Sequence, residues 1–218
     1  MKTVIFGDSA FAERILFFIK AETNDEVVAF TTTSKTLVRN QIEGIPVIPL
    51  DKLDESIGGR DFSILLAIGY SRMNQLRESI YKDLLARGYT IRSFVSKNSI
   101  LYSNRIGEGC IILPNSYIGP NVVLGVCNFV AASCSISHDT VIGDFNFFST
   151  GVIIGGFANV GNHCFIGLNS TVKSEIFISD YTLVGSSTNM LCPTEENCVY
   201  VGNPGKRLEN KKALEVTI

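Results

Sequence analysis

Apolar runs alternate with amphipathic segments in the first 93 residues. Apolar positions recur with helical spacing at residues 11–19 and 72–87, which predicts two helices. The remaining apolar runs are short and are bounded by glycine, proline or polar residues, which predicts strands. These strands lie at residues 2–6, 26–30, 45–48, 62–68 and 89–94. Strands separated by helices of this length favour βαβ units and a parallel sheet.

A second pattern, with a period of six, begins at Phe94. Large apolar residues occupy every sixth position up to Met190, with no insertion. The chain is 45% hydrophobic, so agreement at all of these positions has a chance probability of roughly one in a million. The seventeen positions are Phe94, Ile100, Ile106, Ile112, Ile118, Leu124, Val130, Ile136, Ile142, Phe148, Ile154, Val160, Ile166, Val172, Ile178, Val184 and Met190.

Two further positions of each hexad are also restricted. Glycine often follows the large apolar residue, at Gly107, Gly119, Gly125, Gly143, Gly155, Gly161, Gly167 and Gly185. The fifth position is small or β-branched, as at Cys110, Ser116, Val122, Cys134, Thr140, Val152, Cys164, Ser170 and Thr182. This pattern is typical of a hexapeptide parallel β-helix, in which three hexads form one coil and residues eighteen apart stack. We expect the apolar and fifth residues to point inward and the glycine to relax the backbone at each corner.

The predicted fold therefore has two parts. Residues 1–93 form a small α/β domain with a parallel, Rossmann-like sheet. Residues 94–218 form a left-handed parallel β-helix with a C-terminal cap. The left-handedness of the β-helix is a property of this class of repeat. It departs from the usual rule that crossover connections are right-handed.

Charge and cysteine content exclude several classes of protein. The net charge is −2 and no strongly basic block occurs, so we expect no nucleic-acid partner. The N-terminal segment carries a Glu-Arg pair within its apolar run, which fits neither a signal peptide nor a membrane span. Six scattered cysteines without a C-x-x-C pair indicate reduced, buried thiols and a cytoplasmic protein, with no metal site.

His138, one of only two histidines, occupies the third place of its hexad and is expected to point outward at a corner. Gly156 lies eighteen residues further on, one coil above at about 4.8 Å, and leaves space for a ligand beside the imidazole. Asp139 can hold one imidazole nitrogen and leave the other as a base. The alternative is a solvated corner histidine without a chemical role. His163 sits in an ordinary Gly-Asn corner and is expected to be structural.

An apolar ladder is predicted on an outward position of the β-helix. Its members are Ile111, Phe129, Phe147, Phe165 and Leu183. A monomer should not leave such a stripe in water, so we expect it to mediate a three-fold assembly. The alternative is that the N-terminal domain or the C-terminal tail covers it.

The hexads, the His138-Asp139 pair and VGNPGKR at 201–207 together resemble the two-domain sugar acyltransferases. These include sialic-acid O-acetyltransferase-like proteins and N-acetyltransferases of nucleotide-linked amino sugars, of the bacillosamine acetyltransferase type. VIFGDSAFAE, EVVAF, GIPVIPL and LLAIGYSRMNQLR are similar to the family's small nucleotide-sugar-binding domain, so the resemblance covers essentially the whole chain.

The resemblance implies a homotrimer that uses acetyl-CoA, with active sites between subunits, in surface polysaccharide biosynthesis. His138 matches the family's general base and Asp139 the acid that orients it. The residues that match coenzyme-contacting positions are Gly156, Leu168, Ser186, Gly202, Asn203, Pro204 and Lys206. A basic, solvated terminus is an equally good interpretation of Lys206.

The resemblance also places the nucleotide sugar on the N-terminal domain. The matching positions are Gly7, Asp8, Ser9, Ala10, Phe11, Thr32, Thr33 and Gly69. The chain departs from the family in its glycine loop, in the threonines that replace acids after the second strand, and at Phe147, where many members have a second histidine.

The leading hypothesis is acetyl transfer from acetyl-CoA to the amine of a nucleotide-linked amino sugar, with His138 as general base. O-acetylation of a sugar hydroxyl would use the same base and stays open. A non-catalytic nucleotide-sugar-binding protein is a third possibility. A metal-dependent hydratase on this fold needs three histidine ligands, and the chain has two histidines.

Overall fold

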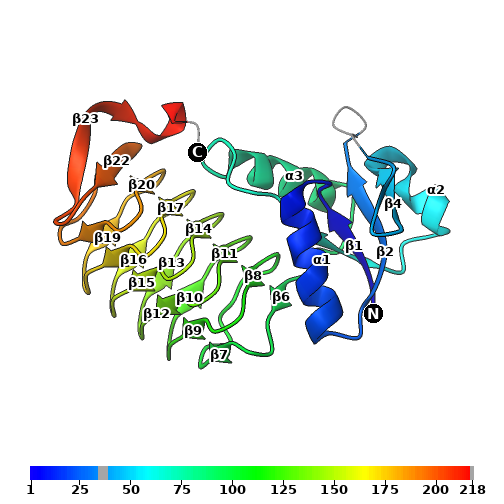
Figure 1. The fold of residues 1–218 in the computed structure, drawn as a ribbon, viewed down its shortest axis with the longest axis horizontal. Helices are drawn as coiled ribbons and strands as arrows, with labels where there is room; N and C mark the ends of the chain where they lie inside the picture. Colours follow the sequence, from blue (N-terminus) through cyan, green and yellow to red (C-terminus); the bar gives the residue numbers. More distant parts are fainter. Residues whose placement is uncertain (34–38, 217–218) are drawn as a thin grey trace. The chain divides into compact units, whose positions relative to one another are not determined.

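The computed structural model describes residues 1–33 and 39–216. Its contacts divide the chain into two compact units, shown in Figure 1. The first comprises Met1–Gly69 and Ser79–Phe94, and the second comprises Tyr70–Glu78 and Val95–Ile218. Residues 70–78 therefore belong with the β-helix, although the sequence-based bounds of 1–93 include them in the first domain. Within the described residues, no helix is long and apolar enough to cross a membrane.

The first unit is built on a five-stranded sheet in the order β3-β4-β2-β1-β5. Its strands are β1 (Lys2–Phe6), β2 (Glu26–Thr32), β3 (Gln41–Ile42), β4 (Ile45–Pro49) and β5 (Ser63–Leu66). Its helices are α1 (Ala10–Glu22), η1 (Leu50–Lys52), α2 (Leu53–Ile57) and the C-terminal part of α3 (Gln75–Ala86). Strands β4, β2, β1 and β5 pair in parallel, as predicted, and their buried centres explain the continuous apolar runs.

Three details of the first unit differ from the sequence-based expectation. The short strand β3 pairs antiparallel with β4, and neither it nor α2 was predicted. Residues 89–94 contribute only the bridge Ile64↔Ile91 and the start of β6, so the last predicted strand is wrong. Helix α3 begins at Gln75 because residues 72–74 all have positive φ and cannot join a right-handed helix.

The second unit is a left-handed β-helix of short parallel strands in three sheets, with one antiparallel pair near the C-terminus, which confirms the predicted fold class. The eight-stranded sheet contains β6 (Phe94–Val95), β8 (Ile111–Ile112), β11 (Phe129–Val130), β14 (Phe147–Phe148), β17 (Phe165–Ile166), β20 (Leu183–Val184), β22 (Cys198–Val201) and β23 (Lys206–Lys212). The six-stranded sheet contains β7 (Ile100–Leu101), β9 (Tyr117–Ile118), β12 (Ser135–Ile136), β15 (Ile153–Ile154), β18 (Thr171–Val172) and β21 (Asn189–Met190). The four-stranded sheet contains β10 (Val123–Leu124), β13 (Val141–Ile142), β16 (Asn159–Val160) and β19 (Phe177–Ile178), and η2 (Ala213–Glu215) lies near the C-terminus.

The predicted interior positions are buried except in the first coil. Ile100 is 55% exposed and Ile106 is half-buried, whereas the other large apolar positions are buried. Ile100 pairs with Tyr117 and Leu101 with Ile118, so the strand is offset by one residue from the count of six. The bridge between Ile106 and Leu124 restores the register. The expectation of an unbroken count is thus wrong at this one strand.

The expectation that the glycines of the hexads relax the backbone at the corners is wrong. From residue 109 to residue 187, positive φ recurs at the fourth hexad position, for example at Asp139 (φ 56°) and Phe145 (φ 55°). Gly119 and its equivalents at the second position have no positive φ. A Cβ on Gly119 would lie 2.8 Å from the His138 backbone nitrogen. These glycines are therefore required by the close approach of successive coils.

The apolar ladder on the eight-stranded sheet is covered by residues 70–78 of the same chain. The Tyr70 ring packs edge-on against Phe147 and Phe165, at 4.8 and 4.9 Å between centroids. Asn74 Nδ2 donates to the Cys164 carbonyl at 3.2 Å, and Met73 packs in a cluster with Leu183. Ile111, Phe129, Phe147 and Leu183 are each at most 7% exposed. The expectation that this ladder requires oligomerisation is wrong.

Candidate active site

His138 and Asp139 lie in the corner between β12 and β13. Figure 1 labels these two strands. His138 Nδ1 lies 2.9 Å from Asp139 Oδ2, and the His138 side chain is 55% exposed. Asn121, which lies on the coil below, donates from Nδ2 to Asp139 Oδ1 at 2.9 Å. Asp139 takes the left-handed conformation that the corner requires, which aspartate tolerates better than most residues.

The electrostatics of this pair define the tautomer of the histidine. The hydrogen bond from His138, reinforced by the one from Asn121, lowers the pKa of Asp139 below its ordinary value. An ionised carboxylate can only accept hydrogen bonds, so the proton of a neutral His138 lies on Nδ1. Nε2 then carries the lone pair and is available to accept a proton.

Gly156 lies against the His138 ring from the coil above. A Cβ at this position would lie 2.9 Å from His138 Cε1 and 3.0 Å from Nε2. The next residue, Phe157, donates its backbone N–H to the His138 carbonyl at 3.1 Å. The structure thus brings His138, Asp139 and Gly156 together, as their spacing predicted.

Leu168 and Ser186 lie at a different corner of the coil. They follow β17 and β20, and the N–H of Ser187 donates to the Leu168 carbonyl at 2.7 Å, so they belong to successive coils. The six-stranded sheet separates this corner from Gly156. Within one chain, the structure does not bring Leu168 and Ser186 to His138.

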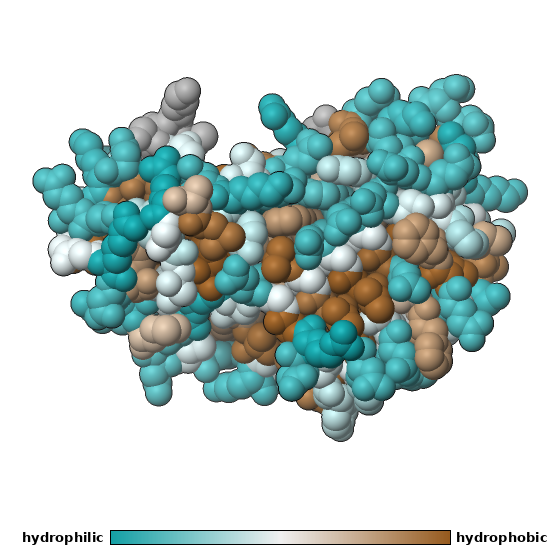
Figure 2. Space-filling model, turned by 180° about the vertical axis from the view of Figure 1, so that it is seen from behind, coloured by the Kyte–Doolittle hydropathy of each residue, from teal (hydrophilic) through white to brown (hydrophobic). Residues whose placement is uncertain are grey.

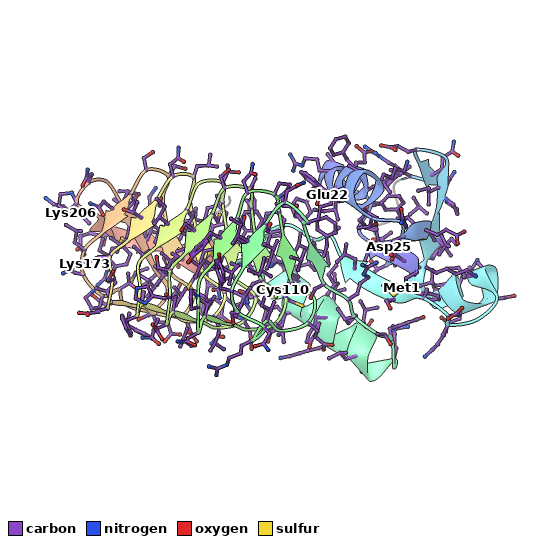
Figure 3. The ribbon with its side chains drawn as sticks, turned by 90° about the horizontal axis from the view of Figure 1, so that it is seen from below. Met1, Glu22, Asp25, Cys110, Lys173 and Lys206 are labelled. Carbon is purple, nitrogen blue, oxygen red and sulfur yellow. The ribbon has the colours of Figure 1, made fainter. Side chains whose placement is uncertain are left out.

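The turn at Gly202, Asn203 and Pro204 covers the end of the six-stranded sheet. The Asn189 N–H donates to the Gly202 carbonyl at 3.1 Å, and Asn189 Nδ2 donates to Asn203 Oδ1 at 3.3 Å. Lys206 follows at the start of β23, and its ammonium group forms no ion pair within the described part of the chain. Figure 3 shows Lys206 and Lys173 at the end of the β-helix away from Cys110.

The sequence-predicted residues of the first unit lie where parallel strands end. Gly7, Asp8 and Ser9 connect β1 to α1, which begins with Ala10 and Phe11. Thr32 ends β2, Thr33 follows it, and Gly69 follows β5. A Cβ on Gly7, which has φ +130°, would lie 2.5 Å from the Ala67 carbonyl oxygen, so only glycine fits there. Because β1 is the neighbour of both β2 and β5, these residues share one edge of the sheet, where ligands of open α/β folds bind.

His163 has the structural role expected of it. It is 5% exposed and stacks between Phe145 and Tyr181, at 5.3 and 4.7 Å between ring centroids. Burial lowers the pKa of His163, although the Glu78 carboxylate 3.3 Å from Nε2 opposes the effect.

Burial also makes the interior thiols poor nucleophiles, since it raises the pKa of Cys134 to about 11 and that of Cys164 to about 12. Across residues 1–33 and 39–216, no three His, Cys, Asp or Glu side chains form a group that could hold a metal.

Asn121 and Phe157 were not singled out from the sequence. Asn121 lies eighteen residues before Asp139, and the same stacking rule that connects His138 with Gly156 would have placed it beside the acid. Phe157 is a turn residue next to Gly156, and no pattern distinguishes it from the other corner residues.

The chain was compared with known proteins. Residues 2–84 match the family model described as the PglD N-terminal domain. A 110-residue stretch is 28% identical to the bifunctional protein GlmU of Clostridium botulinum and covers 47% of this chain. The chain spans about a quarter of the length of that relative, 24%.

Two solved structures match nearly the whole chain. One is the acetyltransferase domain of PglB from Neisseria gonorrhoeae in complex with acetyl coenzyme A, with TM-score 0.82, 18% identity and coverage of 95% of this chain and 98% of that one. The other is a histidine-to-asparagine mutant of perosamine N-acetyltransferase from Caulobacter crescentus with CoA and GDP-perosamine, with TM-score 0.83, 19% identity and coverage of 96% and 98%. The chain therefore has the fold of these two acetyltransferase structures, and its N-terminal part matches the PglD N-terminal domain.

Proposed function

We propose that this protein transfers an acetyl group from acetyl-CoA to the amine of a nucleotide-linked amino sugar. The observation that carries the proposal is the His138-Asp139 pair, with an exposed imidazole held at Nδ1 and bordered by Gly156. A solvated corner histidine needs neither the oriented carboxylate nor the glycine above its ring. The two acetyltransferase structures of the same fold support the same reaction class.

His138 acts in this proposal as the general base. The sugar amine attacks the thioester carbonyl, and Nε2 of His138 accepts the proton that the amine gives up. The C–S bond then breaks, and the proton passes to the leaving sulfur to give CoA and the acetylated sugar. A positioned general base contributes about 10²–10⁴-fold to such a step.

The acetyl donor is proposed to contact Gly156, Leu168, Ser186, the Gly202-Asn203-Pro204 turn and Lys206. Because Gly156 and Leu168 lie at different corners of one chain, a single coenzyme reaches both only when two subunits meet. A homotrimer with its sites between subunits satisfies this requirement. Several apolar side chains on the β-helix, among them Val141, Ile153 and Leu168, are 45–52% exposed and available for such contacts. Figure 2 shows apolar patches among polar residues on one face of the molecule.

The nucleotide sugar is proposed to bind the first unit at Gly7–Phe11, Thr32, Thr33 and Gly69. Ser9 is the N-cap residue of α1 and makes no side-chain cap hydrogen bond, and the N-terminal end of a helix is where a phosphate is favoured. Six free cysteines, of which only Cys192 is exposed, fit the reducing cytoplasm in which we place the reaction.

Mass spectrometry of reactions with acetyl-CoA and a panel of UDP-, TDP- and GDP-linked amino sugars tests the proposal, with hydroxyl counterparts alongside. We expect one amino sugar to gain an acetyl group. The His138→Asn variant should bind CoA and the sugar nucleotide as the wild type does but lose at least 10²-fold in kcat.

The outcomes separate the alternatives. Acetylation of the hydroxyl compounds alone would replace N-transfer by O-transfer. Binding of both ligands without any product would refute catalysis and leave a binding protein. Full turnover by His138→Asn would refute the assignment of the base.

A further inference from the structure

Phe157 lies beside the proposed base in an exposed position. Its ring and the His138 imidazole are 5.2 Å apart between centroids and nearly perpendicular, at 87°. The backbone hydrogen bond from Phe157 to the His138 carbonyl ties the two residues together across successive coils. No other aromatic ring packs on Phe157 within the described ranges. The contact is thus specific to His138.

The conformation of Phe157 is costly for a residue without a role. Its φ is +58°, a region that is unfavourable for bulky side chains, and it is 53% exposed. Phe145 and Tyr181 share this left-handed corner position, but each stacks on His163 and gains packing in return. Among the described residues, His138 is the one ring that Phe157 contacts. An aromatic residue kept in water at such a position points to a function.

The contacts with Asp139 and Gly156 leave one rotation of the His138 imidazole unrestrained. Asp139 fixes Nδ1, but the ring can still pivot about that hydrogen bond because the Cε1–Nε2 edge faces Gly156, which has no side chain. Phe157 is the side chain that borders the ring on the side of this upper coil.

We propose that Phe157 is a positioning residue that holds the His138 imidazole with Nε2 directed at the acceptor. The inference rests on the proposed function and adds a residue that no part of the acetyl-transfer argument requires. Edge-to-face pairs are directional, so the ring restrains the tilt of the imidazole as well as its place. The apolar ring also shields the side of the imidazole from water.

Replacement of Phe157 by asparagine separates positioning from stability. Asparagine is favoured in the left-handed region, so Phe157→Asn should keep or raise the Tm. The kcat should fall about three- to tenfold, the value of an aromatic pair, with the KM of both substrates unchanged. Phe157→Tyr keeps the aromatic ring and should have the kcat of the wild type. A purely structural role predicts instead that kcat follows Tm.

Tyr102→Asn is the matched control, because Tyr102 is 66% exposed and its ring contacts one other described aromatic residue, Tyr117 at 5.9 Å. It should leave kcat unchanged. Wild-type kcat in Phe157→Asn beside an inactive His138→Asn would overturn this inference alone. Full activity of His138→Asn would overturn the assignment of the base and this inference with it.

A second readout does not depend on turnover. The chain has two histidines, so the imidazole ¹⁵N signals of His138 can be assigned by their loss in His138→Asn. The wild type should show a single Nδ1–H tautomer. Phe157→Asn should shift or broaden these signals, and an unchanged spectrum would contradict the positioning role.

Discussion

Replacement of Gly156 by alanine tests the geometry of the proposed site with a single methyl group. The added Cβ would lie 2.9 Å from His138 Cε1, 3.0 Å from Nε2 and 3.3 Å from the His138 carbonyl oxygen. Real Cβ atoms do not approach ring atoms so closely, so the imidazole has to move. The φ of Gly156 is not positive, and alanine can adopt it without backbone strain.

The expected effects on stability and activity differ in size. Forcing the His138 side chain away from its preferred rotamer costs about 0.5–1.5 kcal/mol. Loss of glycine from the unfolded chain returns about 0.4–1 kcal/mol, so the free energy of unfolding should change by less than about 1 kcal/mol. Displacing a catalytic group by about 1 Å costs on the order of 10²-fold in rate, so kcat should fall about 10- to 100-fold.

Urea denaturation and mass-detected turnover measure the two quantities on the same preparation. Low kcat with wild-type stability would locate the effect at the imidazole. Gly151→Ala is not a suitable control, since Gly151 has φ +76°. Gly69→Ala is also excluded because Gly69 is a proposed substrate contact, so wild-type protein is the reference. Wild-type kcat in Gly156→Ala would refute the argument that the ring is held where the reaction needs it.

Two further predictions concern stability. Burial alone would raise the pKa of Asp25, but Arg92, 2.6 Å away, and the terminal ammonium outweigh it and hold the pKa below its ordinary value. A carboxylate whose pKa is lower in the folded state stabilises the fold at pH values above its unfolded-state pKa. This stabilisation is lost as the pH falls through the folded-state pKa. Asp25→Asn should therefore lose about 1–3 kcal/mol at pH 7 and converge with the wild type below about pH 4 in urea titrations, whereas a constant difference would contradict the ion-pair account. Tyr70→Ala removes the ring that covers Phe147 and Phe165, so the free energy of unfolding should fall by about 2–4 kcal/mol. Binding of a hydrophobic dye should increase. Unchanged stability and dye binding would show that other residues cover the ladder.

The β-helix was predictable because its rules act along the chain at fixed spacing. The count of six identified the interior residues, and the count of eighteen placed Gly156 against His138 before any coordinates. The offset at Ile100 escaped this count because its neighbour Leu101 is also apolar and can take the interior place. Both residues satisfy the same hydrophobic pattern, and only strand pairing distinguishes them.

The cover of the apolar ladder could not be predicted in the same way. Tyr70 lies 77 residues before Phe147, and no period relates them. The left-handed turn at residues 72–74 contains no glycine, so the sequence gives no sign that the helix starts three residues late. The sequence predicted correctly that the ladder needs a cover. The leading prediction, a neighbouring subunit, is wrong, and the alternative, a part of residues 1–93, is confirmed by the contacts of Tyr70 and Asn74.

The coil repeat also makes the distance along the β-helix a quantity that changes in whole steps. Every coil advances one strand spacing, about 4.8 Å, and returns each corner to the same side. Removal of eighteen residues between Gly156 and the Gly202 turn would keep all corners in phase and bring the turn one step nearer to His138. Removal of any other short number would rotate the later corners away from the earlier ones. The distance from His138 to the Gly202 turn can therefore vary only by multiples of one coil, and so can the length of a ligand that spans it.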